Sequence, residues 1–145
     1  MKILKTTLLV GLTGAMATGL ALAASAPGNG SQEISTAHAH ALLAKSATTV
    51  AMSQTHLHHV INCLVGPNGT GFDAAAGNPC KGQGNGAIPD SAADSTLHGK
   101  LQSALSDAQA GLKADSLTAV QSDAGKAAVT LQDASGAGAA ASSSW

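Results

Sequence analysis

Histidine is the side chain with the clearest chemical potential in this chain of 145 residues, which contains six of them. His56 and His59 are three residues apart, so they share one face if the segment is helical. Met52 comes four residues before His56 and extends the same face. Imidazole together with a thioether suits copper, and imidazole alone suits zinc, nickel or copper. The stripe therefore predicts a transition-metal site.

A third imidazole is expected from a neighbouring helix. If the first helix ends near Leu64 and the next one packs antiparallel to it, His98 lies at the same end of the bundle. His58 or His59 could then reach His98 across the interface and complete a three-imidazole site.

His38 and His40 precede this stripe in the sequence. On one continuous helix they would lie about five turns from His56. We therefore do not expect them in the same mononuclear site.

The histidines also fit two alternative roles. A histidine on a helix surface is often simply solvated, and His59 could instead be a core residue bonded to a loop carbonyl. Histidine pairs, or histidine with methionine, also bind haem inside helical bundles. The chain has no Cys-x-x-Cys-His attachment motif, and it contains one Phe, one Trp and no Tyr. These features argue against haem as a cofactor.

The segment 33–64 must position most of these side chains. It contains neither Pro nor Gly and carries five of the six histidines. Its apolar residues recur at spacings of three and four, which is typical of a helix that faces other helices. A single helix of about 30 residues would be about 45 Å long. Thr48 and Thr49 lower helix propensity, and a break near 46–49 would divide the segment into two helices.

The stretch 66–90 is rich in Gly, Asn and Pro and has no periodicity. Cys63 comes just before it and Cys80 lies in its middle. Two cysteines in an exported chain favour a disulfide, and closing a loop of this length contributes about 3 kcal/mol. The alternative is a pair of thiolate metal ligands. We expect an ordered loop clamped by Cys63–Cys80.

Two further helices complete the expected fold. Ser91 and Asp94 resemble a capping box for the second helix, and Asp115 or Ser116 caps a third helix that runs to about Gln132. The short break between these helices implies antiparallel neighbours. The sequence therefore predicts an all-α protein, an antiparallel three-helix bundle. A four-helix bundle is the alternative if the first helix breaks.

The N-terminus has the pattern of a signal peptide at 1–23. Lys2 and Lys5 precede an uncharged apolar segment, and Ala21-Leu22-Ala23 has the form of a cleavage site. An uncleaved membrane anchor is the alternative. With cleavage, we expect a periplasmic or secreted bacterial protein without a membrane span. Its parts would be a disordered leader at 24–32, a bundle domain at 33–133 with the loop 66–90, and a flexible tail at 134–145.

Composition argues against two classes of function. The formal net charge is −1 and none of the basic residues is Arg, so the chain has no basic patch for nucleic acid. It has no Gly-x-Ser-x-Gly motif and no carboxylate pair in an evident cleft, so we do not expect an enzyme. The Gly82–Gly86 run lacks the Lys-Ser/Thr of a phosphate loop.

A signal peptide followed by a histidine-bearing helix and helical hairpins resembles the small His-rich periplasmic metal-binding proteins, which form helical bundles. The loop between Cys63 and Cys80 departs from that pattern. The resemblance implies buffering or transfer of Cu, Zn or Ni. The alternative is a non-catalytic module whose clamped loop binds another envelope protein, with the histidines incidental. The residues that carry the resemblance are His38, His40, His56, His58 and His59.

Overall fold

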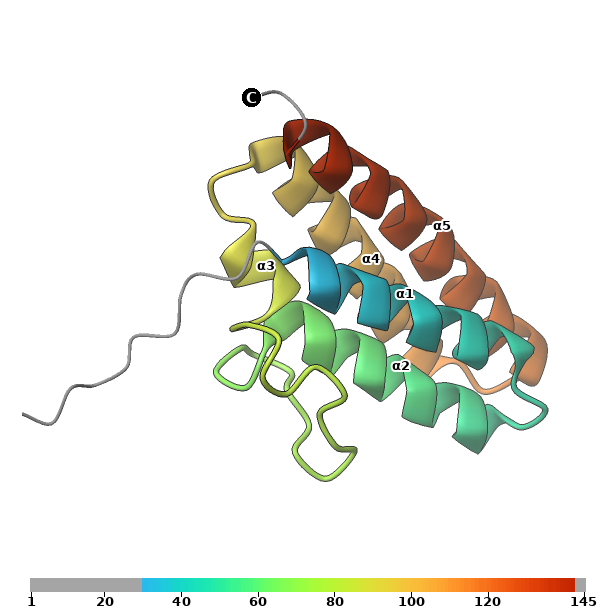
Figure 1. Cartoon of the computed structure of the whole chain (residues 1–145). Helices are drawn as coiled ribbons and strands as arrows, with labels where there is room; N and C mark the ends of the chain where they lie inside the picture. Colours follow the sequence, from blue (N-terminus) through green and yellow to red (C-terminus); the bar gives the residue numbers. More distant parts are fainter. Residues whose placement is uncertain (1–29, 143–145) are drawn as a thin grey trace, which may run out of the picture.

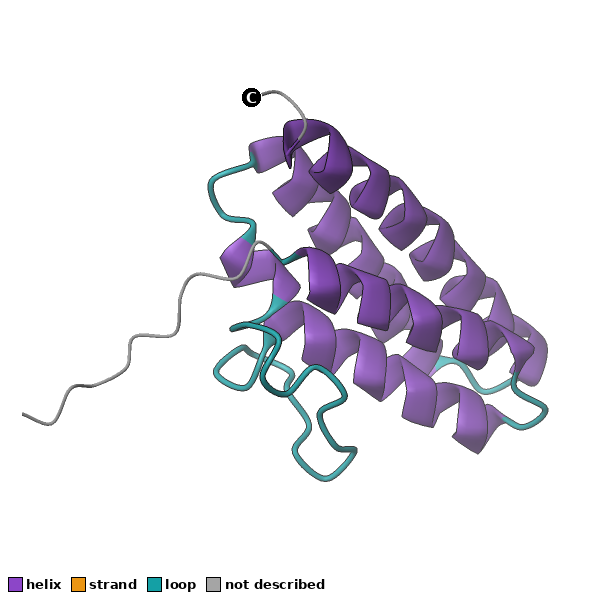
Figure 2. Ribbon diagram, in the orientation of Figure 1, coloured by secondary structure: helices purple, strands orange, loops and turns teal. Residues whose placement is uncertain are grey.

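The computed structural model describes residues 30–142, and the side chains of residues 30–136. Within this range the regular secondary structure consists of helices without any strand, which confirms the predicted all-α class. Four long helices pack side by side as a bundle, and the short α3 lies at one end (Figures 1 and 2). The predicted signal peptide and residues 24–29 of the leader lie outside the described residues. The helices are α1 (Ser31–Ser46), α2 (Val50–Val65), α3 (Ala87–Asp90), α4 (Ser95–Lys113) and α5 (Leu117–Ser142).

The predicted first helix, Glu33–Leu64, is in fact two helices. The chain reverses between α1 and α2, so the prediction of one continuous helix is wrong and its alternative, a break near 46–49, holds. Thr49 caps α2, because its Oγ1 accepts the Met52 N–H at 3.2 Å. Ser53 donates its hydroxyl to the Ala44 carbonyl at 2.7 Å and so satisfies the end of α1. These short polar side chains replace the backbone hydrogen bonds that a continuous helix would make.

The core is built from aliphatic side chains and many alanines. Helix α1 contributes Ala37, Ala41 and Ala44 to the core, all fully buried. Such small residues let two helices approach closely. The largest fully buried aliphatic side chains come from four helices, and they are Ile34, Leu57, Val60, Leu64, Leu101, Val120 and Leu131.

The helices after the loop begin and end at residues that differ from those expected. Asp94 caps α4, because its Oδ1 accepts the N–H groups of Thr96 and Leu97, each at 3.0 Å. Ser91 does not act as that cap, since it follows α3 and donates its hydroxyl to the Ile88 carbonyl. Helix α5 continues past the expected end to Ser142, so most of the segment expected as a tail is helical. Residues 143–145 lie outside the described range.

The loop between α2 and α3 returns closely onto the end of α2. Gly66 has φ +70°, and a Cβ there would lie only 1.6 Å from the Asn85 carbonyl oxygen. Only glycine fits such an approach in that conformation. The Glu33 side chain reaches the same region from α1, with 1 % of the residue exposed, and its Oε1 accepts the Gly86 N–H at 2.8 Å. The loop is thereby joined to both α1 and α2.

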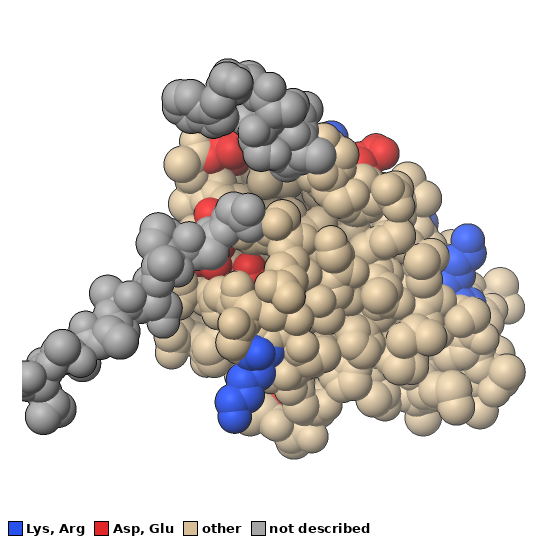
Figure 3. Space-filling model, viewed as in Figure 1, with Lys and Arg blue, Asp and Glu red and all other residues tan. Residues whose placement is uncertain are grey.

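Charge is sparse on this molecule. Only 10 % of the residues are charged, and the face in Figure 3 shows scattered Lys, Asp and Glu side chains with no dense cluster of one sign. No helix within residues 30–142 is both long and apolar enough to cross a membrane.

Candidate metal centre

Three histidines from two helices meet on the side of the bundle formed by α1 and α2. His40 lies on α1, and His56 and His59 lie one turn apart on α2. One ring nitrogen of each lies within 4.8 Å of the others, and all three residues are half-buried. The ring centroids of His40 and His59 are 4.6 Å apart, and those of His40 and His56 are 5.4 Å apart. We call these three residues the His triad.

The spacing of the triad nitrogens matches that of ligands around one metal ion. The Nδ1 atom of His40 lies 3.2 Å from Nδ1 of His56 and 3.3 Å from Nδ1 of His59. Two nitrogens bound to a tetrahedral Zn²⁺ at about 2.05 Å lie about 3.3 Å apart. A metal ion could therefore bind His40 together with either of the other two rings at these separations.

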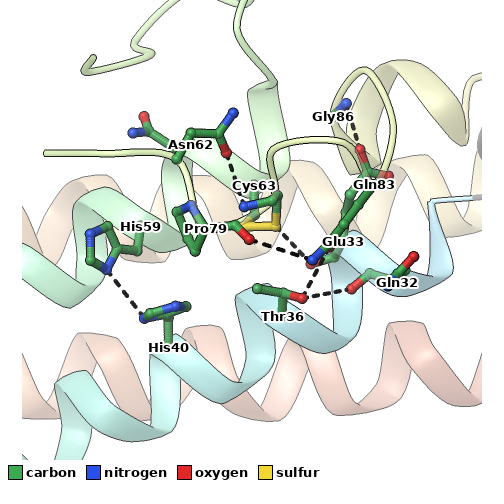
Figure 4. The surroundings of a disulfide bond; sticks show 12 residues. Gln32, Glu33, Thr36, His40, His59, Asn62, Cys63, Pro79, Gln83 and Gly86 are labelled. Carbon is green, nitrogen blue, oxygen red and sulfur yellow. Dashed lines mark hydrogen bonds between the residues drawn. A yellow bond between two sulfur atoms is a disulfide. The ribbon is translucent and has the colours of Figure 1, made fainter. Parts of the chain in front are cut away.

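A backbone carbonyl of the loop fixes the state of His59. Its Nε2 lies 2.7 Å from the carbonyl oxygen of Ala76. Because a carbonyl oxygen only accepts hydrogen bonds, Nε2 must carry a hydrogen, and in the neutral ring the lone pair is then on Nδ1. That lone pair is directed toward the His40 Nδ1 (Figure 4). A hydrogen bond to the distal nitrogen of this kind orients metal-binding histidines in proteins.

Asn62 holds the part of the loop that carries this carbonyl. Asn62 is buried on α2, and its Nδ2 donates to the carbonyls of Asp73 and Gly77 at 2.7 and 2.6 Å. Its Oδ1 accepts the Asp73 N–H at 2.8 Å. One side chain thus satisfies three backbone groups on either side of Ala76, which stabilises the loop conformation at His59.

The electrostatics favour the neutral imidazole at two residues of the triad, His40 and His56. Burial, and then the neighbouring His59 and His56, lower the pKa of His40 from 6.5 to about 4. Burial and His59 also lower the pKa of His56. Neutral imidazole is the form that binds a metal ion, so at neutral pH little proton release opposes binding at these two residues.

The disulfide lies next to the triad. Cys63 follows His59 by one turn of α2, and its sulfur is bonded to that of Cys80 in the loop, with Cα atoms 5.2 Å apart. Cys80 Sγ also lies 3.9 Å from the Glu33 carbonyl oxygen on α1. With both cysteines paired in this way, the structure does not use them as metal ligands. Figure 4 shows the disulfide between the loop, α1 and α2.

The structure brings two of the predicted site residues together, His56 and His59, and adds His40. It does not place His98 in this group. Helix α2 turns Leu57 toward α4, where a Cβ on Gly111 would lie 2.5 Å from Leu57 Cδ1, while His59 faces α1. The Nδ1 atom of His98 is buried without a hydrogen-bond partner among the described residues.

The remaining predicted residues lie around the triad or away from it. His58 faces the loop, with its Nδ1 3.3 Å from Asp73 Oδ2. Met52 lies one turn before His56 and is 49 % exposed, and its role as a ligand stays a prediction. His38 lines a pocket of about 210 Å³ between α1 and α5.

The exclusion of His40 from the site is wrong. It followed from the continuous helix, on which His40 and His56 are far apart. The reversal between α1 and α2 brings them to hydrogen-bonding distance. The signal that could have revealed it is Thr49, a residue type that favours helix N-caps, directly before the apolar periodicity of α2.

A larger cleft lies between the loop and α4. Its volume is about 640 Å³, and its lining includes Val65, Thr70, Ile88, Leu105 and Gln109 with no charged side chain.

The chain matches no model of a known protein family, no curated protein and no solved structure.

Proposed function

We propose that this chain is an exported protein that binds a divalent transition metal, Zn²⁺, Cu²⁺ or Ni²⁺, through the His triad, and that it buffers or transfers this metal. The observation that carries the proposal is the convergence of three Nδ1 atoms, two of the distances being 3.2 and 3.3 Å. A ligand set of imidazoles alone suits these three ions. Three protein ligands leave a fourth position open, which suits exchange of the metal with another molecule.

Export is the part of the proposal that rests on sequence. The signal-peptide pattern at 1–23 supports it. A disulfide between Cys63 and Cys80 is also typical of proteins in an oxidising compartment. Metal transfer in the cell envelope would combine both features.

The test is a calorimetric titration of the oxidised chain with Zn²⁺, Cu²⁺ and Ni²⁺. We expect one ion per chain with a submicromolar Kd for at least one metal. His40→Gln, His56→Gln and His59→Gln should each weaken binding by at least about 100-fold, more than the loss of an outer hydrogen bond to a ligand. His38→Gln is the matched control from the same helix as His40 and should bind like the wild type.

Two results would contradict the proposal. One is no binding, or binding only at millimolar concentration. The second is binding that persists in all three triad variants. Either result would favour the alternative, an interaction module whose clamped loop presents the cleft between the loop and α4 to another envelope protein.

A further inference from the structure

The Ala76 carbonyl that accepts the His59 hydrogen bond belongs to a segment that has no regular secondary structure to stabilise it. Residues 66–86 contain no helix or strand, and they are rich in glycine. Gly66, Cys80 and Gly86 are buried there, but most of the segment is exposed or half-buried. A segment of this kind loses a large conformational entropy in one fixed conformation and gains little apolar burial in return.

Several of the contacts that fix this segment join it to the two helices of the triad. On the α2 side, Asn62 binds the backbone around Ala76. On the α1 side, the Thr36 hydroxyl lies 3.0 Å from Gln83 Oε1, one turn before His40. The covalent bond between Cys63 and Cys80 lies between these two sets of hydrogen bonds (Figure 4).

We infer that the Cys63–Cys80 disulfide assembles the metal site, so that the chain reaches full metal affinity only after it has been oxidised. This inference rests on the proposed function of the triad. The disulfide joins the loop to α2 and so holds the loop where the Ala76 carbonyl accepts the His59 Nε2–H. Its Cys80 end also contacts the Glu33 carbonyl of α1, the helix that carries His40. Without the disulfide, the hydrogen on His59 can move to Nδ1, and that nitrogen then has no lone pair for the metal.

The chemistry is balanced and runs in one order. Two thiols of the exported chain give two electrons and two protons to an oxidant disulfide, which leaves as a dithiol, and the Cys63–Cys80 bond forms. The divalent ion then binds neutral imidazoles with no change of oxidation state. Cys63 is 0 % exposed and Cys80 is 4 % exposed, so a thiolate cannot reach the finished bond easily. Oxidation is therefore a maturation step and not a reversible switch.

The test compares Zn²⁺ affinity in two chains by competition with a coloured chelator. One is the oxidised wild type, and the second is Cys63→Ser/Cys80→Ser. We expect binding in the double variant to be about 10- to 100-fold weaker, the loss typical when the support of a ligand is removed. Leu131→Ala on α5, which destabilises the fold away from the triad, should retain wild-type affinity. Far-UV circular dichroism checks that each variant is helical.

A direct readout is the His59 tautomer in the metal-free chain. Nitrogen-15 shifts of the imidazole should show hydrogen on Nε2 in the oxidised wild type and a mixture of both tautomers in the double variant. Equal Zn²⁺ affinity and equal tautomers in the two chains would overturn the inference while leaving the triad as a metal site. Failure of the wild type itself to bind Zn²⁺, Cu²⁺ or Ni²⁺ would instead overturn the proposed function.

If the double variant does not fold, the inference can be tested on the wild type by measuring the reduction potential of the disulfide with and without Zn²⁺. Binding and disulfide formation must favour each other equally, so a tenfold coupling lowers the potential by about 30 mV when Zn²⁺ is present. The shift should vanish in His59→Gln. An unchanged potential, or a higher one caused by Zn²⁺ binding to the free thiols, would contradict the inference.

Discussion

His40 stays neutral in the folded chain at pH values where a histidine in an unfolded chain binds a proton. Burial, and then His59 and His56, lower its pKa from 6.5 to about 4. Between these values the unfolded chain binds more protons, so the free energy of unfolding falls as the pH falls through this window. We expect denaturant titrations of the metal-free protein from pH 7 to pH 4 to show this loss. In His40→Gln the loss should be smaller; an identical pH dependence would contradict the assignment.

Glu33 shows the opposite behaviour at a second buried site. Burial raises its pKa, the Gly86 hydrogen bond opposes that rise, and the nearby Asp90 carboxylate adds to it. When folding raises the pKa of a carboxyl group, the free energy of unfolding falls as the pH rises above the ordinary pKa of that group. Glu33→Gln keeps the acceptor for Gly86 and removes the charge. We therefore expect this variant to be more stable than the wild type at pH 7 and to lose the advantage near pH 4. Destabilisation at pH 7 in denaturant titrations would contradict this account.

At the scale of the elements, α4 contains two glycines in opposite environments. A Cβ on Gly111 would lie 2.5 Å from Leu57 Cδ1 on α2, whereas a Cβ on Gly99 would meet nothing within 4 Å. Gly111→Ala should therefore destabilise the bundle by about 1–3 kcal/mol through overpacking, although alanine favours the helix. Gly99→Ala should stabilise it by up to about 1 kcal/mol. Denaturant unfolding of both variants gives the two signs, and equal shifts would show that α2 and α4 do not pack closely at Gly111.

The extent to which these elements follow from the sequence depends on whether local or distant residues determine them. The apolar periodicity of α2, α4 and α5 is local, so their helical nature could be predicted. The end of α1 depends on distant groups: Ser53 donates to its last turn, and Gln121 of α5 donates from Nε2 to the Ala47 carbonyl at 2.8 Å. Thr49 is a local signal of this reversal, but no Pro or Gly reinforces it, and sequence patterns do not show such tertiary partners.

The candidate site was predictable to the same degree. His56 and His59 share a helix face by spacing alone, and the structure brings them together. His40 could not be added without the reversal between α1 and α2, which places residues on separate helices beside each other. The role of the Ala76 carbonyl could not be predicted either, because every residue has a backbone carbonyl and the aperiodic loop gives no pattern from which its position follows.

At the scale of the whole molecule, the triad links α1 to α2, and both helices also contact α5. Metal binding to the folded chain should therefore stabilise the entire bundle against unfolding. At a free Zn²⁺ concentration of 100 times Kd, the expected stabilisation is about 2.7 kcal/mol. For a domain of this size, this raises the Tm by about 8–16 °C.

Thermal unfolding at several Zn²⁺ concentrations measures this effect, and removal of the metal with EDTA should reverse it. His59→Gln should unfold at a Tm that does not depend on Zn²⁺, whereas His38→Gln should follow the wild type. The pH adds a second control, because neutral imidazoles are required: the Zn²⁺-dependent rise should shrink as the pH falls toward 4, where His40 begins to bind protons. A rise in Tm that survives in His59→Gln would mean that Zn²⁺ stabilises the chain at a different place, and the triad would then not be the Zn²⁺ site.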